Sequence, residues 1–235
     1  SLRTAAPENV VIVDTTPDRP RVLGEVDLFS AQVLVHERAI YIHESVQYYV
    51  DRLEWGERKA YVHRVDVDHY TYANRAVTLK PLDVFAETPA TGGRRAHGEV
   101  MVASLVTLFK KLKFVTDENI GWGPIHLPEL ELQTTAYWLT AEGVADRWRR
   151  DELDVALIGA GRAIQAVASV LLMVDPRDLG LVAQVRSPHQ EAPTIYLYEA
   201  VPGGVGLSER LFARHDELVT GAAQNIAACH CEAGC

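Results

Sequence analysis

Short runs of β-branched and aromatic residues, separated by turn residues, dominate the chain up to about residue 140. Runs of this length and composition are typical of β-strands. The pattern predicts strands at Val10–Asp14, Val22–Asp27, Ala39–His43, Gln47–Leu53 and Lys59–Val67. The short connection between the last two predicts an antiparallel hairpin in which Gly56 takes a positive φ. We therefore expect the first third of the chain to form a small β-barrel or a curled antiparallel sheet.

A stretch rich in Pro, Gly and Thr, residues 88–95, predicts a loop that separates these strands from a second extended stretch, Glu99–Phe114. The period changes near residue 141, where helical spacing begins. Val144–Arg150 and Val155–Val174 predict helices, and the proline within Asp175–Asp178 predicts the end of the second one.

Two more strands, Leu181–Arg186 and Thr194–Ala200, predict a short β-hairpin. A last helix is expected at Leu207–Ala227, and its apolar residues recur mostly at steps of three or four: Leu207, Leu211, Leu218, Ala222 and Ile226. We expect this face to pack on the Val155–Val174 helix. The predicted fold is α+β, with a β-rich domain at 1–90, a β-rich connecting segment at 91–140 and a helical domain at 141–235.

The Val155–Val174 segment is long and apolar enough to be compared with a membrane span. Its interior contains Arg162, Gln165 and Ser169, and a central Arg costs about 2.5–3.5 kcal/mol on insertion scales. The segment is also rich in Ala and Gly rather than Leu and Ile. These features favour a buried core helix, and we expect no membrane association.

Composition and charge restrict where nucleic acid can bind. The 235 residues are 48% hydrophobic and 23% charged, which is enough for a sizeable core, and the net charge is −9. Because the whole chain repels phosphate, binding depends on local basic clusters. The candidates, interleaved with aromatic residues, are Arg94, Arg95, Lys110, Lys111, Lys113, Arg147, Arg149 and Arg150. Such interleaving can follow a single strand, although a solvated surface around core aromatics explains the same residues and is favoured.

All three cysteines lie within the last seven residues, as Cys229, Cys231 and Cys235. A secreted disulfide framework distributes its cysteines through the fold, so a reducing compartment is the simpler interpretation. Thiolates this close in sequence can surround one tetrahedral Zn²⁺, which needs four ligands. His230 lies between two candidate ligands and is expected to be an exposed neighbour. Ser1–Pro7 has no signal sequence and no initiator Met, so we expect a piece of a longer protein.

Two other motifs favour structural roles. Pro202–Gly206 joins a strand to a helix and could bind an anion with its backbone amides, but a tight turn is favoured because the Lys of a P-loop is missing. Asp175 and Asp178 flank Arg177, which suits a turn held by charge-assisted hydrogen bonds rather than catalysis. The sequence contains no Gly-x-Ser-x-Gly nucleophile elbow.

Three motifs resemble a known family. Residues 171–180 read LLMVDPRDLG, residues 196–209 read YLYEAVPGGVGLSE, and the tail reads Cys229-x-Cys231-x-x-x-Cys235. Together they resemble the zinc-binding domain at the C-terminus of mitomycin repair factor A and its helicase relatives. Earlier residues such as Val67-Asp68-His69-Tyr70-Thr71 resemble the region after the motor in the same proteins, so the resemblance covers nearly the whole chain.

The resemblance implies part of a superfamily 2, DEAD/DEAH-box, ATP-dependent DNA helicase or single-strand translocase that acts in DNA repair. We expect a cytoplasmic protein, associated with the nucleoid if it is bacterial. The motor, with its ATP and Mg²⁺, would lie upstream of Ser1, and this chain has no ATPase motif of its own. Its expected partners are single-stranded DNA and the motor domains of the same protein. The family's cysteine cluster continues with a fourth Cys three residues after the third, so 141–235 would be a zinc-binding domain truncated at its C-terminus.

Two alternatives remain open. Related zinc modules also look like scaffold subunits of phage-defence systems that bind a separate helicase. A free-standing hydrolase is a weaker alternative because the sequence shows no paired nucleophile and base, although a buried carboxylate cluster near Asp175 would support it.

Overall fold

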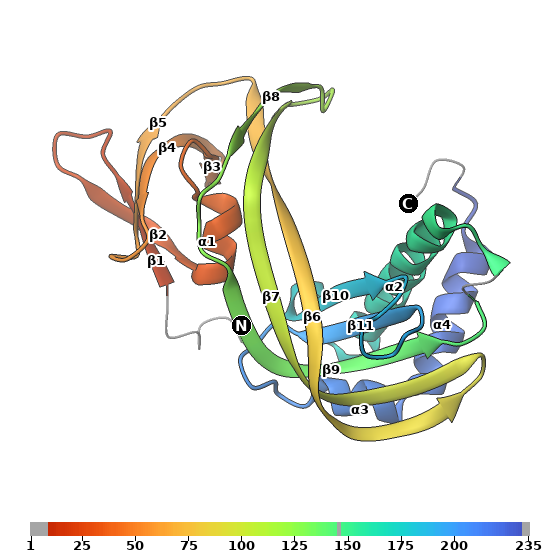
Figure 1. Cartoon of the computed structure of the whole chain (residues 1–235). Coiled ribbons are helices and arrows are strands. Elements are labelled where there is room, and N and C mark those ends of the chain that lie inside the picture. Colours follow the sequence, from red (N-terminus) through yellow and green to blue (C-terminus); the bar gives the residue numbers. More distant parts are fainter. Residues whose placement is uncertain (1–8, 145–146, 232–235) are drawn as a thin grey trace. The chain divides into compact units, whose positions relative to one another are not determined.

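The computed structural model describes residues 9–144 and 147–231. The chain folds into two compact units that alternate along the sequence. Unit 1 contains the residues up to Val77 together with Ala103–Glu131, and unit 2 contains Thr78–Val102 together with the residues from Leu132 onward. The expected ranges 1–90 and 91–140 each contribute to both units. Figure 1 shows the elements of both units in sequence colours.

Unit 1 contains a five-stranded sheet in the order β2-β1-β5-β4-β3. The strands are β1 (Asn9–Asp14), β2 (Arg21–Asp27), β3 (Ile40–His43), β4 (Val46–Glu54) and β5 (Lys59–Arg64). β1 pairs in parallel with β5, and the other pairs along this order are antiparallel. Every second residue of β1 is buried, as expected for a strand with one face on a core. The expected α+β class with a curled sheet is confirmed, although this sheet is mixed rather than purely antiparallel.

A short helix, α1 (Leu28–Leu34), covers the core of this sheet and was not expected from the sequence. The carboxylate of Asp27 caps it by accepting a hydrogen bond from the Ser30 amide at 2.9 Å. Ala31 and Val35 are fully buried against the sheet residues. At seven residues the helix is too short to give a clear periodic signal, and packing rather than propensity stabilises it.

The expected hairpin between β4 and β5 is present, but its turn differs from the prediction. Arg58 takes the positive φ, at 55°, and Gly56 does not. The amides of Glu57 and Arg58 donate to the carbonyls of Glu54 and Trp55, which closes the turn. The position of the glycine in the sequence therefore did not identify the left-handed residue.

The predicted loop at residues 88–95 is wrong. These residues belong to a long hairpin of β6 (His69–Ala90) and β7 (Gly93–Lys113), joined by a turn in which Gly92 has a φ of 81°. The sheet order places β6 at an edge, where a strand tolerates residues such as Pro89 that cannot donate a hydrogen bond. Pro and Thr in this stretch resemble a loop by composition although the backbone is extended.

The second sheet has the order β10-β11-β9-β7-β6, with β8 (Asn119–Pro124) paired to β7. β9 is Leu130–Ala141, and the expected hairpin is present as β10 (Leu179–Gln184) and β11 (Thr194–Glu199). Figure 1 shows the helix α2 (Arg150–Leu172) beside β10 and β11, with which it shares a core.

The helices of unit 2 differ from the prediction at three places. α2 runs from Arg150 to Leu172. A helix was expected at 144–150, but its described residues before Arg150 are not α-helical. Residues 145–146 lie outside the described residues. The expected last helix is two helices, α3 (Leu207–Ala213) and α4 (His215–Ala228), because Arg214 leaves helical geometry. Ile226, expected to be buried, is 54% exposed. The expected stop after α2 is present as the 3-10 helix η3 (Pro176–Asp178).

One face of α2 packs into the core of unit 2, as expected. Its buried residues contact β10, β11 and α4, and include Leu153, Leu157, Ile164, Ala168 and Leu172. Among the described residues, α2 is one helix whose length and composition would suffice to cross a membrane. The exposed residues of α2 are both charged and apolar, and include Arg162, Val155 and Val170.

A fully buried histidine, His36, lies in unit 1 beside the ring of Phe109, with the two ring centroids 4.8 Å apart. Its Nδ1 lies 2.9 Å from the carbonyl oxygen of Glu37, and its buried Nε2 has no hydrogen-bond partner in the described residues. Burial lowers the pKa of His36, the nearby charge of Arg38 lowers it further, and the contact with the Glu37 carbonyl opposes both effects. His36 is therefore neutral in the folded chain at neutral pH.

We predict a pH-dependent loss of stability from this histidine. Because its pKa is lower in the folded chain, the unfolded chain binds the proton first as the pH falls, and the free energy of unfolding decreases below about pH 6.5. In His36→Gln this decrease should be smaller, measured by urea unfolding between neutral and mildly acidic pH. The exposed His126→Gln serves as the control. An identical pH dependence in wild type and His36→Gln would contradict the prediction.

Candidate metal centre and basic clusters

A buried carboxylate, Glu199 at the end of β11, organises the turn that leads into α3. It is fully buried, and it accepts hydrogen bonds from the hydroxyl of Thr135 at 2.7 Å and from the amide of Ser208 at 2.8 Å. Its other oxygen accepts from the amide of Val205. A carboxylate at a helix N-terminus stabilises the unpaired amides there, so the anion that this turn binds is a side chain of the protein itself.

The glycines of this turn are required by its backbone geometry. Gly203, Gly204 and Gly206 have φ values of 74°, 72° and 85°, a region that glycine adopts without strain. A side chain at Gly204 would also lie 2.3 Å from the hydroxyl of Thr135, which is the group that donates to Glu199. The tight-turn interpretation of Pro202–Gly206 is therefore correct.

The charged turn after α2 is structural, as predicted. Arg177 forms a two-pronged ion pair with Asp175, with Nη2 to Oδ2 at 2.7 Å and Nε to Oδ1 at 3.0 Å. The same carboxylate accepts from the Arg177 amide, which caps η3. Asp178 is buried, and its carbonyl accepts from the amide of Ala200. This arrangement ties η3 to the end of β11, and no group of three metal-binding side chains lies near it in the described residues.

The packing of α4 on α2 positions the cysteine tail. Leu218 and Ala222 are buried against α2, and a side chain at Gly221 would lie 3.0 Å from Val167. Beyond Ala222, every described residue through Cys231 is exposed. The last turns of α4 therefore extend past the buried part of the core, where Ile226 is 54% exposed.

Cys229 and Cys231 follow directly after α4, and both are exposed. The amide of Cys229 donates to the carbonyl of Ile226, which ends the helix. Cys235, the third expected ligand, lies outside the described residues, and the described residues alone contain no group of three donors that could hold a metal. Two closely spaced thiols on an accessible helix end nevertheless have the donor chemistry that Zn²⁺ prefers. His230 is exposed beside them, as expected.

The basic residues proposed for nucleic acid separate into two groups. Lys110, Lys111 and Lys113 lie on β7 in unit 1, whereas Arg94, Arg95, Arg147, Arg149 and Arg150 lie in unit 2. The structure describes these groups separately, and each is considered by its own contacts.

Three of the five candidate arginines in unit 2, Arg94, Arg95 and Arg149, contact neighbouring side chains. Arg94 forms ion pairs with Glu87 at 3.2 Å and with Glu142 at 2.8 Å. Arg95 lies with its guanidinium carbon 5.1 Å from the centre of the Phe212 ring. These contacts support the interpretation of this pair as part of the fold rather than as phosphate ligands.

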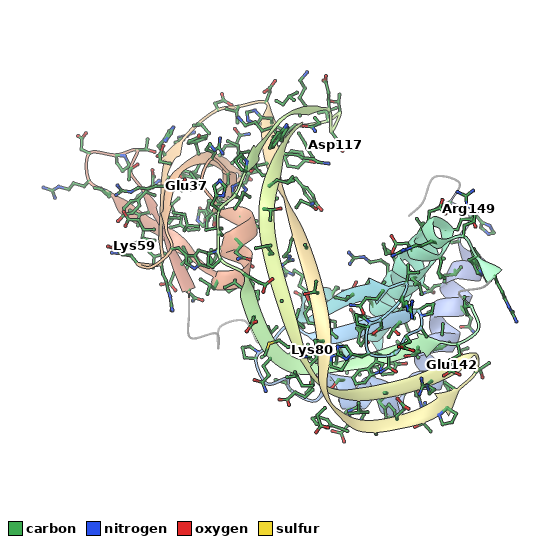
Figure 2. All side chains as sticks on the ribbon, in the orientation of Figure 1. Glu37, Lys59, Lys80, Asp117, Glu142 and Arg149 are labelled. Carbon is green, nitrogen blue, oxygen red and sulfur yellow. The ribbon has the colours of Figure 1, made fainter. Side chains whose placement is uncertain are left out.

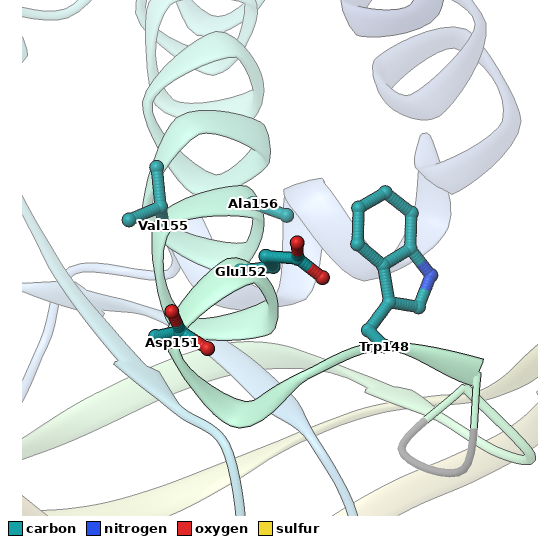
Figure 3. A pocket seen from close by; sticks show the side chains of 5 residues that line it. All are labelled: Trp148, Asp151, Glu152, Val155 and Ala156. Carbon is teal, nitrogen blue, oxygen red and sulfur yellow. The ribbon is translucent and has the colours of Figure 1, made fainter.

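Arg149 binds the carboxylate of Asp151 through two nitrogens, at 2.9 and 3.3 Å, at the start of α2. Figure 2 labels Arg149 at this position. A shallow depression beside it is lined by Trp148, Glu152 and Val155, and Figure 3 shows the Glu152 carboxylate pointing toward the indole. Because the carboxylates of Asp151 and Glu152 lie beside Arg149, this surface offers a phosphate little net positive charge.

A buried pair of polar side chains, which the sequence did not reveal, joins β9 to α4. The hydroxyl of Tyr137 lies 2.7 Å from Nδ1 of His215, and both side chains are buried. Burial raises the pKa of Tyr137, while burial and the nearby Arg95 lower the pKa of His215. Neither tyrosine spacing nor histidine count signals such a pair, because the partners are far apart in sequence.

The comparisons with known proteins agree with the resemblance found in the sequence. Residues 160–235 match the family model of the MrfA Zn-binding domain. The chain is 44% identical to the ATP-dependent helicase YprA of Bacillus subtilis (strain 168) over 236 residues, covering all of this chain and 32% of YprA. The chain carries an MrfA Zn-binding domain and is a relative of the MrfA and YprA helicases. It spans about a third of the length of these relatives.

Solved structures of this family extend the match to the whole fold. The crystal structure of the DUF1998 helicase MrfA bound to DNA aligns with a TM-score of 0.74 and 44% identity, covering all of this chain and 32% of that one. A second crystal structure of MrfA aligns with a TM-score of 0.69 and 38% identity over 98% of this chain and 32% of that one. The ATP-dependent helicase HRQ1 of Saccharomyces cerevisiae is 21% identical over 253 residues, covering all of this chain and 23% of HRQ1.

Exchanging the buried carboxylate should reveal its structural role. In Glu199→Gln, an amide nitrogen must replace one carboxylate oxygen that now accepts backbone hydrogen bonds, leaving a buried donor unsatisfied. We expect a loss of about 2–3 kcal/mol in the free energy of unfolding. The same substitution at the exposed Glu217, which pairs with Arg214 on the surface, should cost much less because solvent screens the pair. Equal losses in the two variants, measured by chemical denaturation, would contradict this role.

Proposed function

We propose that this chain is the zinc-binding accessory region of an ATP-dependent DNA helicase that acts in DNA repair. The observation that supports this most strongly is the match of the whole chain, at 44% identity, to MrfA, a helicase crystallised with DNA. The chain has no nucleotide-binding loop, so ATP and Mg²⁺ would be used by motor domains of the same protein.

Zinc would be held by Cys229, Cys231 and Cys235 together with a fourth ligand. The described residues of α4 beyond Ala222 are exposed, and a structural zinc supplies stability where little apolar surface is buried. Zinc held by these thiolates would cross-link the end of the chain and would supply no chemistry to a reaction. The protein's own residues then anchor this end through the contacts of Leu218 and Ala222 with α2.

The role of this region would be to support the motor and to shape the path of a single DNA strand. The scaffold alternative, a zinc module that binds a separate helicase subunit, is less favoured. YprA, HRQ1 and MrfA, which match this chain, are helicases by name.

An exchange of the matching regions tests the proposal. In the YprA helicase of Bacillus subtilis, the segment aligned with this chain is replaced by residues 1–235. We expect the chimera to retain ATP-dependent strand separation within about tenfold of intact YprA, whereas YprA without the segment should lose most of it. The measurement is unwinding of a labelled duplex with a single-stranded tail.

A matched control uses the same chimera with Cys229→Ser and Cys231→Ser. Its unwinding should fall toward that of the deletion if zinc binding stabilises the region. A chimera that hydrolyses ATP but unwinds no better than the deletion would argue against a role in supporting the motor.

A further inference from the structure

A tryptophan on β8, Trp122, is 71% exposed although large aromatic side chains are usually buried. It lies on the strand directly opposite Lys110 of β7 in the antiparallel register. Residues opposite each other in a sheet point to the same face, so the indole and the ammonium group share one surface. Pro124, two residues after Trp122, is exposed on the same face. We call Lys110, Trp122 and Pro124 the Trp122 face.

The opposite face of the same strands is buried and holds β8 in place. Phe109 is 1% exposed and lies under Gly123, where a side chain would come within 2.7 Å of the phenyl ring. Arg38 lies over this ring, 5.4 Å from its centre, and donates to the carbonyl of Pro124 at 3.2 Å. Trp122 is therefore presented by a strand that is fixed from behind, which lowers the entropy lost on binding a ligand.

Lys110 carries the positive charge of this face. Lys113 pairs with Glu118 at 2.8 Å, and the carboxylate of Asp117, at the turn labelled in Figure 2, accepts a hydrogen bond from the neutral hydroxyl of Tyr70. Lys110 forms no ion pair with another residue of 9–144 and 147–231. A flat apolar ring beside an available ammonium group suits a base and its phosphate better than an apolar protein surface, which would leave the ammonium group buried without a partner.

We propose that the Trp122 face binds single-stranded DNA, with one base stacked on the indole of Trp122 and a neighbouring phosphate held by Lys110. This inference rests on the proposed function, which brings a single strand to this region, and adds the place and the contacts. Because every base has a π-face, the site reads no sequence.

The test uses the full 235-residue chain and a fluorescent oligo(dT) strand, with binding followed by anisotropy. Trp122→Ala should weaken binding by about five- to a hundred-fold, the range expected for loss of one stacked base. Trp122→Phe keeps a smaller aromatic ring and should retain most of the affinity. Trp148→Ala, which removes an indole that is 51% exposed in unit 2, is the matched control and should bind as the wild type does.

Two further measurements distinguish stacking from a structural effect. The intrinsic fluorescence of the wild type should be quenched by oligo(dT), and this quenching should be largely lost in Trp122→Phe but kept in Trp148→Phe. Lys110→Ala should reduce the slope of log K against log salt by about 0.7, as expected for one phosphate contact to a single strand. If Trp122→Ala unfolds at a lower temperature than the wild type, Trp122→Phe and Lys110→Ala carry the test.

The outcomes separate this inference from the proposed function. Unchanged affinity and quenching in the Trp122 variants, with a wild-type chain that binds oligo(dT), would overturn the Trp122 face and leave the helicase role intact. A wild-type chain that does not bind oligo(dT) would also overturn it, and the chimera with YprA then decides the helicase role by itself. Equal affinity for oligo(U) would extend the same stacking site to RNA.

Discussion

The carboxylate of Glu199 is the interaction on which the arrangement of unit 2 depends. A fully buried charge is costly unless hydrogen bonds replace its hydration, and Glu199 obtains them from three elements. Thr135 belongs to β9, Val205 to the glycine-rich turn, and Ser208 to the first turn of α3. One side chain therefore sets where the chain leaves β11, how the turn folds and where α3 begins.

The packing of α2 then determines what the core can and cannot hold. One face of this helix contacts β10, β11 and α4, which places the first half of α4 firmly against the core. The described residues after Ala222 are exposed. A metal bound at the end of α4 would supply there what apolar burial supplies elsewhere, and this gives a physical reason for cysteines at this position.

Much of the fold could be predicted from the sequence because its elements have strong periodic signals. The strands of the first sheet, the hairpin of β10 and β11, and the buried face of α2 all follow patterns within one element. The long hairpin of β6 and β7 could not, because Pro and Thr near its turn have the composition of a loop. The break at Arg214 was missed for a similar reason, since Leu211 and Leu218 keep helical spacing across it.

The candidate sites were predictable to different degrees. Cysteine spacing pointed to zinc because ligands close in sequence need no tertiary information. Lys110 was recognised as basic, but its position opposite Trp122 depends on strand register, which sequence spacing does not give. The role of Glu199 depends equally on partners far away in sequence, such as Thr135.

The central claim, that the cysteine tail holds zinc, is tested most directly by X-ray absorption at the zinc edge on the zinc-loaded chain. The account predicts a first shell dominated by sulfur at about 2.3 Å, which loses sulfur in Cys229→Ser and Cys231→Ser and is unchanged in His230→Ala. A shell of nitrogen and oxygen alone at about 2.0–2.1 Å, unaffected by the cysteine substitutions, would contradict it.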